Sequence, residues 1–63
     1  MSLHDYQKSR QLEREPFYAL IMAAMRNADA ANLELLQSAW PEVWRELSDR
    51  YNAPGGVLPD DMG

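Results

Sequence analysis

The longest uninterrupted apolar run lies at positions 17–25 and reads FYALIMAAM. Pro16 stands directly before this run, and we expect it to be the first residue of a helix, where a missing backbone N–H costs nothing. The residues with the spacing of a core-facing stripe are Phe17, Leu20, Ile21, Ala24, Met25 and Ala28. Tyr18 and Met22 make the opposite side apolar as well. A helix that is apolar all round must be covered all round.

Three further segments have helical patterns with recognisable ends. Ser2 and Asp5 form a weak capping box, and Asp29 is a good cap for a later helix. Pro41 suits a first helical position, and Asn52 can adopt the left-handed conformation that ends a helix. The expected helices are 3–14, 16–27, 30–39 and 41–51. The sequence therefore predicts an all-α protein, a small bundle of three to four short helices that is completed by homo-oligomerisation.

The chain divides into an arm, a body and a tail. Residues 1–15 are expected to form a polar N-terminal helix or arm, and residues 16–58 a helical core. Residues 59–63 are expected to be a flexible acidic tail with nothing to bury. Before the tail, Pro54 and Gly55 suit the central pair of a type II turn. The residues expected in the core are Leu36, Trp40, Trp44 and Leu47, from two consecutive helices.

Self-association is expected because the chain has too few other apolar residues to cover the helix at 16–27. A chain of 63 residues is marginally stable alone, and without cysteine it has no disulfide to hold it. The arm is too polar to cover the side carrying Tyr18, Met22 and Met25, and soluble monomers usually avoid such a patch. We therefore expect these three residues to form an interface between copies.

The charge of the chain argues against nucleic acid as a partner, and the length of its apolar run argues against a membrane. The net charge is −4, and residues 17–63 hold three arginines against seven acids. Nucleic-acid binding needs a basic face, so no nucleic acid is expected as a partner. The apolar run is about half as long as a membrane span, and no signal peptide is suggested. We expect no membrane association and a cytoplasmic location.

Catalytic chemistry has little to build on. His4 is the only histidine and there is no cysteine, so the usual nucleophile–base pairs are missing from a single chain. Asp60 and Asp61 lie in the expected tail, where they would solubilise the chain instead of binding a metal. We expect a protein that is not an enzyme, with no cofactor and no metal.

The arm has two interpretations. In the simpler one it is a solvated helix that packs lightly on its neighbours, and in the more specific one it binds an anion. Anion binding would use tyrosine and arginine, which stack on and clamp planar or phosphorylated ligands. The candidate ligand-binding residues are Tyr6, Arg10, Arg14 and Arg26. Arg26 would need a partner subunit to bring it to Arg14.

Three stretches resemble short helical proteins of phages and prophages. They read YALIMAAMRNAD at 18–29, WPEVW at 40–44 and RYNAPGG at 50–56, so the resemblance covers most of 17–57. It implies an accessory role in the cytoplasm of a host cell. Some such proteins assemble into oligomers that sequester nucleotide immune signals, and others block a host protein. The resemblance transfers no individual site residue.

Three functions remain open from the sequence. The leading one is a non-enzymatic oligomer, a phage counter-defence protein that sequesters a nucleotide-like signalling ligand. The acidic balance counts against a phosphorylated ligand unless basic residues gather across subunit boundaries. The second is an acidic inhibitor or adaptor that acts on a host protein. The third is a purely structural helical subunit.

Overall fold

The computed structural model describes residues 2–62, and within this range all regular elements are helices and there is no strand. The elements are α1 (Leu3–Leu12), α2 (Phe17–Asn27), α3 (Ala30–Ala39), α4 (Pro41–Asn52), and the short 3-10 helices η1 (Pro54–Gly56) and η2 (Pro59–Met62). The predicted all-α class is confirmed. Met1 and Gly63, the outer ends of the predicted arm and tail, lie outside the described residues.

Two helices begin at the predicted caps. The Asp5 backbone N–H donates to Ser2 Oγ at 3.2 Å, and the Ser2 N–H donates to Asp5 Oδ2 at 3.0 Å, which completes the capping box of α1. The Asn32 N–H donates to Asp29 Oδ1 at 2.8 Å at the start of α3. Each cap satisfies backbone donors that a helix leaves unpaired in its first turn.

The junction between α1 and α2 differs from the expectation by a few residues. Helix α1 ends at Leu12 instead of residue 14, and the Glu15 N–H donates to the Leu12 carbonyl at 3.0 Å in the turn that follows. Pro16 is not the first helical residue of α2 but the residue before it, with φ −57° and ψ 139°. A proline disfavours the helical region for the residue preceding it, which explains the early end of α1.

The end of α4 does not use the left-handed conformation expected of Asn52. Asn52 stays helical, and the chain leaves the helix at Ala53. The Gly56 N–H donates to the Ala53 carbonyl at 3.0 Å, and Gly55 has φ 64° and ψ 11°. These values fit the predicted type II turn, in which the third residue needs a positive φ.

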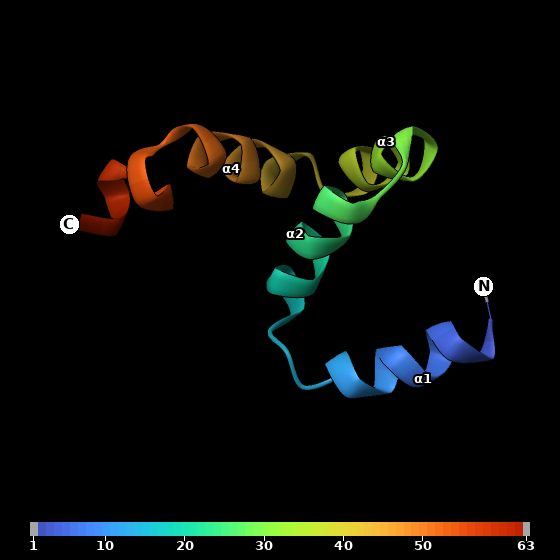
Figure 1. The fold of residues 1–63 in the computed structure, drawn as a ribbon. Helices are drawn as coiled ribbons and strands as arrows, with labels where there is room; N and C mark the ends of the chain where they lie inside the picture. The colour runs from blue at the N-terminus through green and yellow to red at the C-terminus, as the bar shows by residue number, and fades with distance from the viewer. Residues whose placement is uncertain (1, 63) are drawn as a thin grey trace.

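The helices form an extended shape and not a closed bundle. Helices α2, α3 and α4 contact one another, whereas α1 makes at most a marginal contact with the other described elements. Helices α1 and α4 extend from α2 in opposite directions (Figure 1). The molecule measures 43 × 26 × 18 Å, and its radius of gyration is 13.6 Å against about 11 Å for a compact chain of this length.

Only Met25, at 2% exposure, is buried among the described residues whose side chains are placed. The predicted core residues Leu36, Trp40, Trp44 and Leu47 are all half-buried. The expectation that they form a closed core is therefore corrected. Three short helices are too few to cover the apolar faces of one another completely. Trp40 nevertheless packs edge-to-face on Phe17, with ring centroids 6.1 Å apart.

The predicted flexible tail is attached to α4 at Asp61. Arg50 donates to both carboxylate oxygens of Asp61, at 2.7 and 3.0 Å, and also to the Gly56 carbonyl at 2.7 Å. The Leu58 N–H donates to Asp61 Oδ2 at 3.0 Å. Asp61 is thus a structural residue and not a free charge. Arg50 keeps only a longer contact, 3.7 Å, with its helical neighbour Glu46.

The Arg50–Asp61 pair predicts a pH-dependent attachment of the tail. The Arg50 hydrogen bonds, helped by the Leu58 N–H, lower the pKa of Asp61 from 3.8 to about 2. Because the folded pKa lies below the ordinary one, the pair contributes stability above pH 3.8 and loses it as the pH falls towards 2. An NMR titration of the Asp61 carboxyl carbon checks this.

Arg50→Gln is expected to return the Asp61 pKa towards its ordinary value, because it removes the bidentate donor. Arg45→Gln removes the same charge from another position of α4 and is the matched control. Equal Asp61 titration curves in the two variants would contradict the assigned pairing.

Candidate functional site

The main candidate site is a groove between the C-terminal half of α2 and the C-terminal half of α4. Its volume is about 360 Å³. The lining residues of this α2/α4 groove are Met25, Arg26, Trp44, Leu47, Ser48, Tyr51 and Asn52. Helical spacing explains the set, because residues three, four and seven apart share one face of a helix. Met25, the one buried side chain among the described residues, thus lines an open groove.

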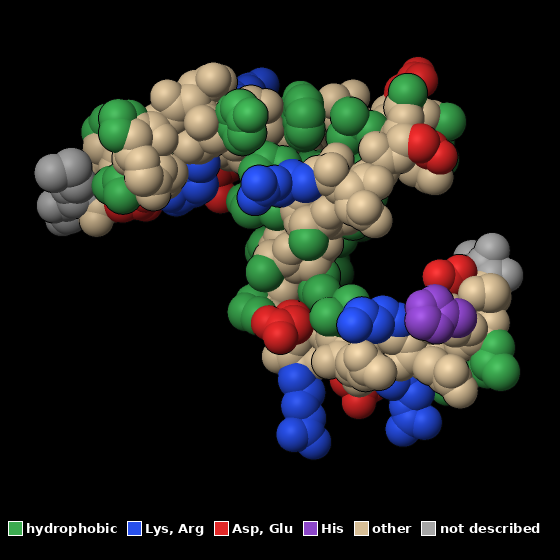
Figure 2. Space-filling view, in the orientation of Figure 1, with side chains coloured by type: hydrophobic (Ala, Val, Ile, Leu, Met, Phe, Trp, Pro, Cys, Tyr) green, Lys and Arg blue, Asp and Glu red, His purple; other side chains and the backbone are tan. Residues whose placement is uncertain are grey.

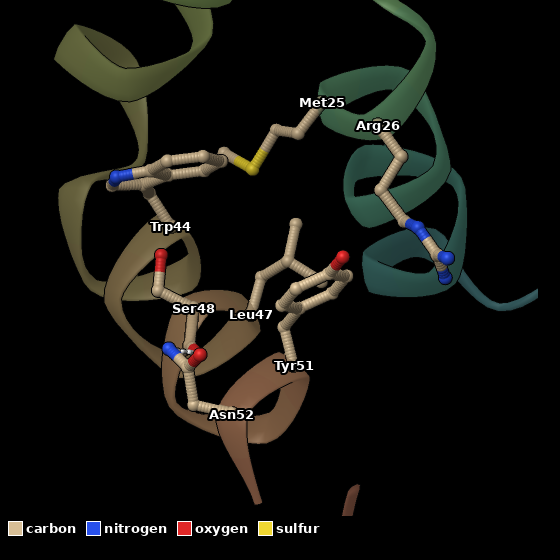
Figure 3. A pocket seen from close by; sticks show the side chains of 7 residues that line it. All are labelled: Met25, Arg26, Trp44, Leu47, Ser48, Tyr51 and Asn52. Carbon is tan, nitrogen blue, oxygen red and sulfur yellow. Dashed lines mark hydrogen bonds between the residues drawn. The ribbon is translucent and has the colours of Figure 1, made fainter.

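The groove has apolar walls and a polar rim. Met25 extends from α2 towards the indole of Trp44, while Leu47 and Tyr51 project from α4 towards α2 (Figure 3). Sulfur–aromatic contacts of this kind are favourable and adaptable in shape. Arg26, in the last turn of α2, supplies the only charged group of the lining. A groove built in this way can hold an apolar or aromatic surface with a negative group near its edge.

The polar side chains of α4 in the groove are partly committed to their own helix. Asn52 Nδ2 donates to the Ser48 carbonyl at 2.9 Å (Figure 3). This bond holds the amide against α4, so Asn52 contributes shape at the rim more than it contributes a mobile donor.

The groove residues are suited to binding and offer no catalytic pair. Arg26 and Tyr51 are the titratable groups of the lining, and Ser48 has no histidine or carboxylate beside it in that lining. Across residues 2–62, no cluster of three histidine, aspartate or glutamate side chains is placed to hold a metal. No described helix is both long enough and apolar enough to cross a membrane.

The predicted ligand-binding residues are divided between two parts of the molecule. Tyr6 and Arg10 lie on α1, and Arg14 follows in the turn after it. Arg26 lies in the α2/α4 groove. Because α1 stands apart from the body, a single chain does not bring the arm residues to Arg26 (Figure 1). A ligand contacting all four needs a second chain.

The predicted interface residues are also divided. Tyr18 is 58% exposed and Met22 is half-buried; both line a second groove with Glu42, Val43 and Glu46 from α4. We call this the Tyr18–Met22 groove. Met25 is buried inside the chain, so its expected place on the open surface is corrected. The reason is that α4 packs against α2, so that Met25 lies beside Trp44 and Leu47, while Tyr18 and Met22 line a separate groove with other residues of α4.

Sequence reasoning recognised Trp44 and Leu47 of the groove but assigned them to a core. Trp44, Leu47 and Tyr51 form the aromatic-rich stripe of α4, which is typical of packing. Ser48 and Asn52 were missed as lining residues. Their signal was their position, since Ser48 is four residues from both Trp44 and Asn52 on one helical face.

Comparison of this chain with the profiles of known protein families, with curated proteins and with solved structures gave no match.

Proposed function

We propose that the protein is a non-enzymatic binding protein that acts as a homo-oligomer. The observation that carries the proposal is its excess of accessible surface. The chain exposes 5555 Å². A compact protein of 7.2 kDa exposes about 4,100 Å². The difference of about 1,400 Å² exceeds the roughly 800 Å² that each partner buries in a standard protein interface.

The exposed apolar side chains give the oligomer its surfaces. Phe17 and Tyr18 pack against each other with ring centroids 5.1 Å apart, yet both remain more than half exposed. Together with Met22 of the Tyr18–Met22 groove they form an apolar edge along α2. Figure 2 shows hydrophobic side chains exposed over several parts of the molecule, the central helix included. Burial of such surface is the main driving force for association.

For the ligand of the oligomer we propose a nucleotide-like anion. Aromatic side chains stack on planar bases, and arginine binds phosphate in a bidentate manner. Tyr6, Arg10 and Arg26 supply these groups, and the resemblance to small phage proteins suggests sequestration of a signalling nucleotide as counter-defence. The working location would then be the cytoplasm of a host cell.

Isothermal titration calorimetry against a panel of cyclic and linear nucleotides tests this function. We expect one member to bind, with an affinity that falls about tenfold or more for each binding arginine that is replaced by alanine. The Arg10→Ala, Arg14→Ala double variant should lower the affinity about a hundredfold or more, because each substitution removes a charged donor to phosphate. Arg45→Ala, on α4 and outside the predicted set, is the control. Unchanged affinity in the double variant would remove both arginines from the site.

A second function is favoured by one specific observation. Glu42 and Glu46 flank the apolar side chains of the Tyr18–Met22 groove. An apolar groove edged by carboxylates suits an amphipathic helix with basic flanks. We propose an inhibitor or adaptor of a basic host protein as the alternative. Titration with a basic amphipathic helical peptide separates the two, because this function predicts saturable binding that Glu46→Gln weakens.

A further inference from the structure

Helix α1 and the α2/α4 groove each lack a partner within the chain. None of the residues 3–12 is buried, and Leu3 and Tyr6 are 70% and 61% exposed. In the space-filling view, open space separates α1 from the upper part of the body (Figure 2). We propose that α1 of one copy docks into the α2/α4 groove of a second copy. This inference rests on the proposed homo-oligomer and adds a second contact between its subunits to the one at the Tyr18–Met22 groove.

The dimensions of α1 suit the groove. Its 10 residues span about 15 Å. The α4 wall from Trp44 to Asn52 spans about 12 Å by the same helical rise. Leu3, Tyr6 and Arg10 lie three and four residues apart, so they share one face of α1. That face presents two apolar side chains for the walls of the groove and one cation at its end.

The distribution of charge favours the arm over a second α2/α4 groove as the occupant of the α2/α4 groove. Residues 1–16 carry three basic and three acidic side chains and are neutral. Residues 17–63 carry the entire net charge of −4. Two α2/α4 grooves meeting face to face would oppose the like net charges of two bodies, whereas the arm is neutral overall. Within the groove Arg10 of the arm would meet Arg26, a like-charge contact that a bound anion would offset.

The direction of the arm favours a second copy over the chain's own groove. Helices α1 and α4 leave α2 on opposite sides (Figure 1). The turn after α1 is held by the Glu15–Leu12 hydrogen bond, and Pro16 fixes the entry into α2 at φ −57°. The arm is therefore held away from its own groove and exposed to another molecule.

Docking of the arm would complete the predicted ligand site. It brings Tyr6 and Arg10 of one copy to the groove that holds Arg26 of the other. Two guanidinium groups and two tyrosines, Tyr6 and Tyr51, would then surround one end of the groove. The site is incomplete without the partner copy, because a single chain leaves the arm residues and Arg26 apart.

Disulfide trapping tests the proposal, since the natural chain has no cysteine. One full-length chain carries Gln7→Cys, on the face of α1 shared with Leu3 and Tyr6. A second, isotope-labelled chain carries Ser48→Cys in the groove. Docking holds the two thiols together, so we expect the mixed disulfide to form about tenfold faster than for undocked chains. Lys8→Cys, on the other side of α1, replaces Gln7→Cys in the matched control.

The outcomes distinguish docking of α1 into the groove of another copy, which we call arm exchange, from oligomerisation through other surfaces. Preferential Gln7–Ser48 disulfides between chains support arm exchange. An intramolecular bridge in the Gln7→Cys, Ser48→Cys double variant, or a mixed rate equal to the Lys8→Cys control, overturns it. If that happens while sedimentation still gives an oligomer mass, arm exchange fails and the proposed function stands. A monomer mass for the parent chain overturns both.

Discussion

Met25→Ala is expected to lower the free energy of unfolding by about 2–5 kcal/mol, the usual cost of truncating a buried methionine to alanine. Met25 is 2% exposed and lines the α2/α4 groove, beside Trp44 and Leu47 of α4. A domain of this size has a total stability of about the same magnitude. The variant should therefore be largely unfolded at 37 °C. Urea denaturation followed by circular dichroism, at one fixed protein concentration, measures the loss.

Leu35→Ala is the matched control for this prediction. Leu35 lies in the middle of α3 and is 67% exposed, so its truncation removes a similar amount of side chain from the surface. We expect a change within about 0.5 kcal/mol. A Met25→Ala variant that unfolds at the same urea concentration as Leu35→Ala would contradict the assignment of Met25 as the centre of the fold.

Met22→Glu is expected to dissociate the oligomer, and to unfold the chain if the monomer is unstable. The substitution places a carboxylate in the Tyr18–Met22 groove, which already holds Glu42 and Glu46. Burying a charge without a partner is costly, and two like charges close by raise the cost. Light scattering measures the mass of the variant, and circular dichroism measures its helix content.

Two further substitutions at residue 22 separate an interface from local repulsion. Met22→Lys introduces a charge that can pair with Glu42 or Glu46, so local repulsion does not disturb it. An interface is disrupted by either charge, because both must lose water on association. Met22→Leu keeps the apolar surface and should keep the oligomer. Dissociation by glutamate alone would show that the Tyr18–Met22 groove is not an interface.

The local features of the fold could be predicted from sequence because their causes are local. The Ser2–Asp5 capping box, the Asp29 cap and the Pro54–Gly55 turn each depend on residues within three positions of one another. The bounds of α3 agree with the prediction at both ends. The boundary error at Pro16 has a local cause too, since proline suits both the first helical position and the residue before it.

Packing could not be predicted in the same way. A stripe such as Trp44, Leu47 and Tyr51 shows which face of a helix is apolar, but it does not show whether another element covers that face. The bundle expected from the stripes is open in the structure, and the arm stands apart from the body. Helices α2 and α4 line two separate grooves, one with Met25 and one with Met22, and this arrangement depends on an interhelical angle that no short motif encodes.

The long-range contacts of the site and of the tail could not be predicted from the sequence for the same reason. Asp61 lies eleven residues from Arg50, so no helical spacing connects them. Arg26 was selected for its chemistry, and the structure places it in a groove whose other walls come from α4. Its separation from Tyr6 and Arg10 depends on the direction of the arm, which only the three-dimensional arrangement gives.

Sedimentation equilibrium of the unmodified protein at micromolar concentration tests the central claim most directly. The account predicts a mass that is an integral multiple, two or more, of the 7.2 kDa chain, with full helix content. A single species of monomer mass that is helical and unfolds cooperatively would contradict it, because the exposed apolar surface would then be stable in water without a second copy.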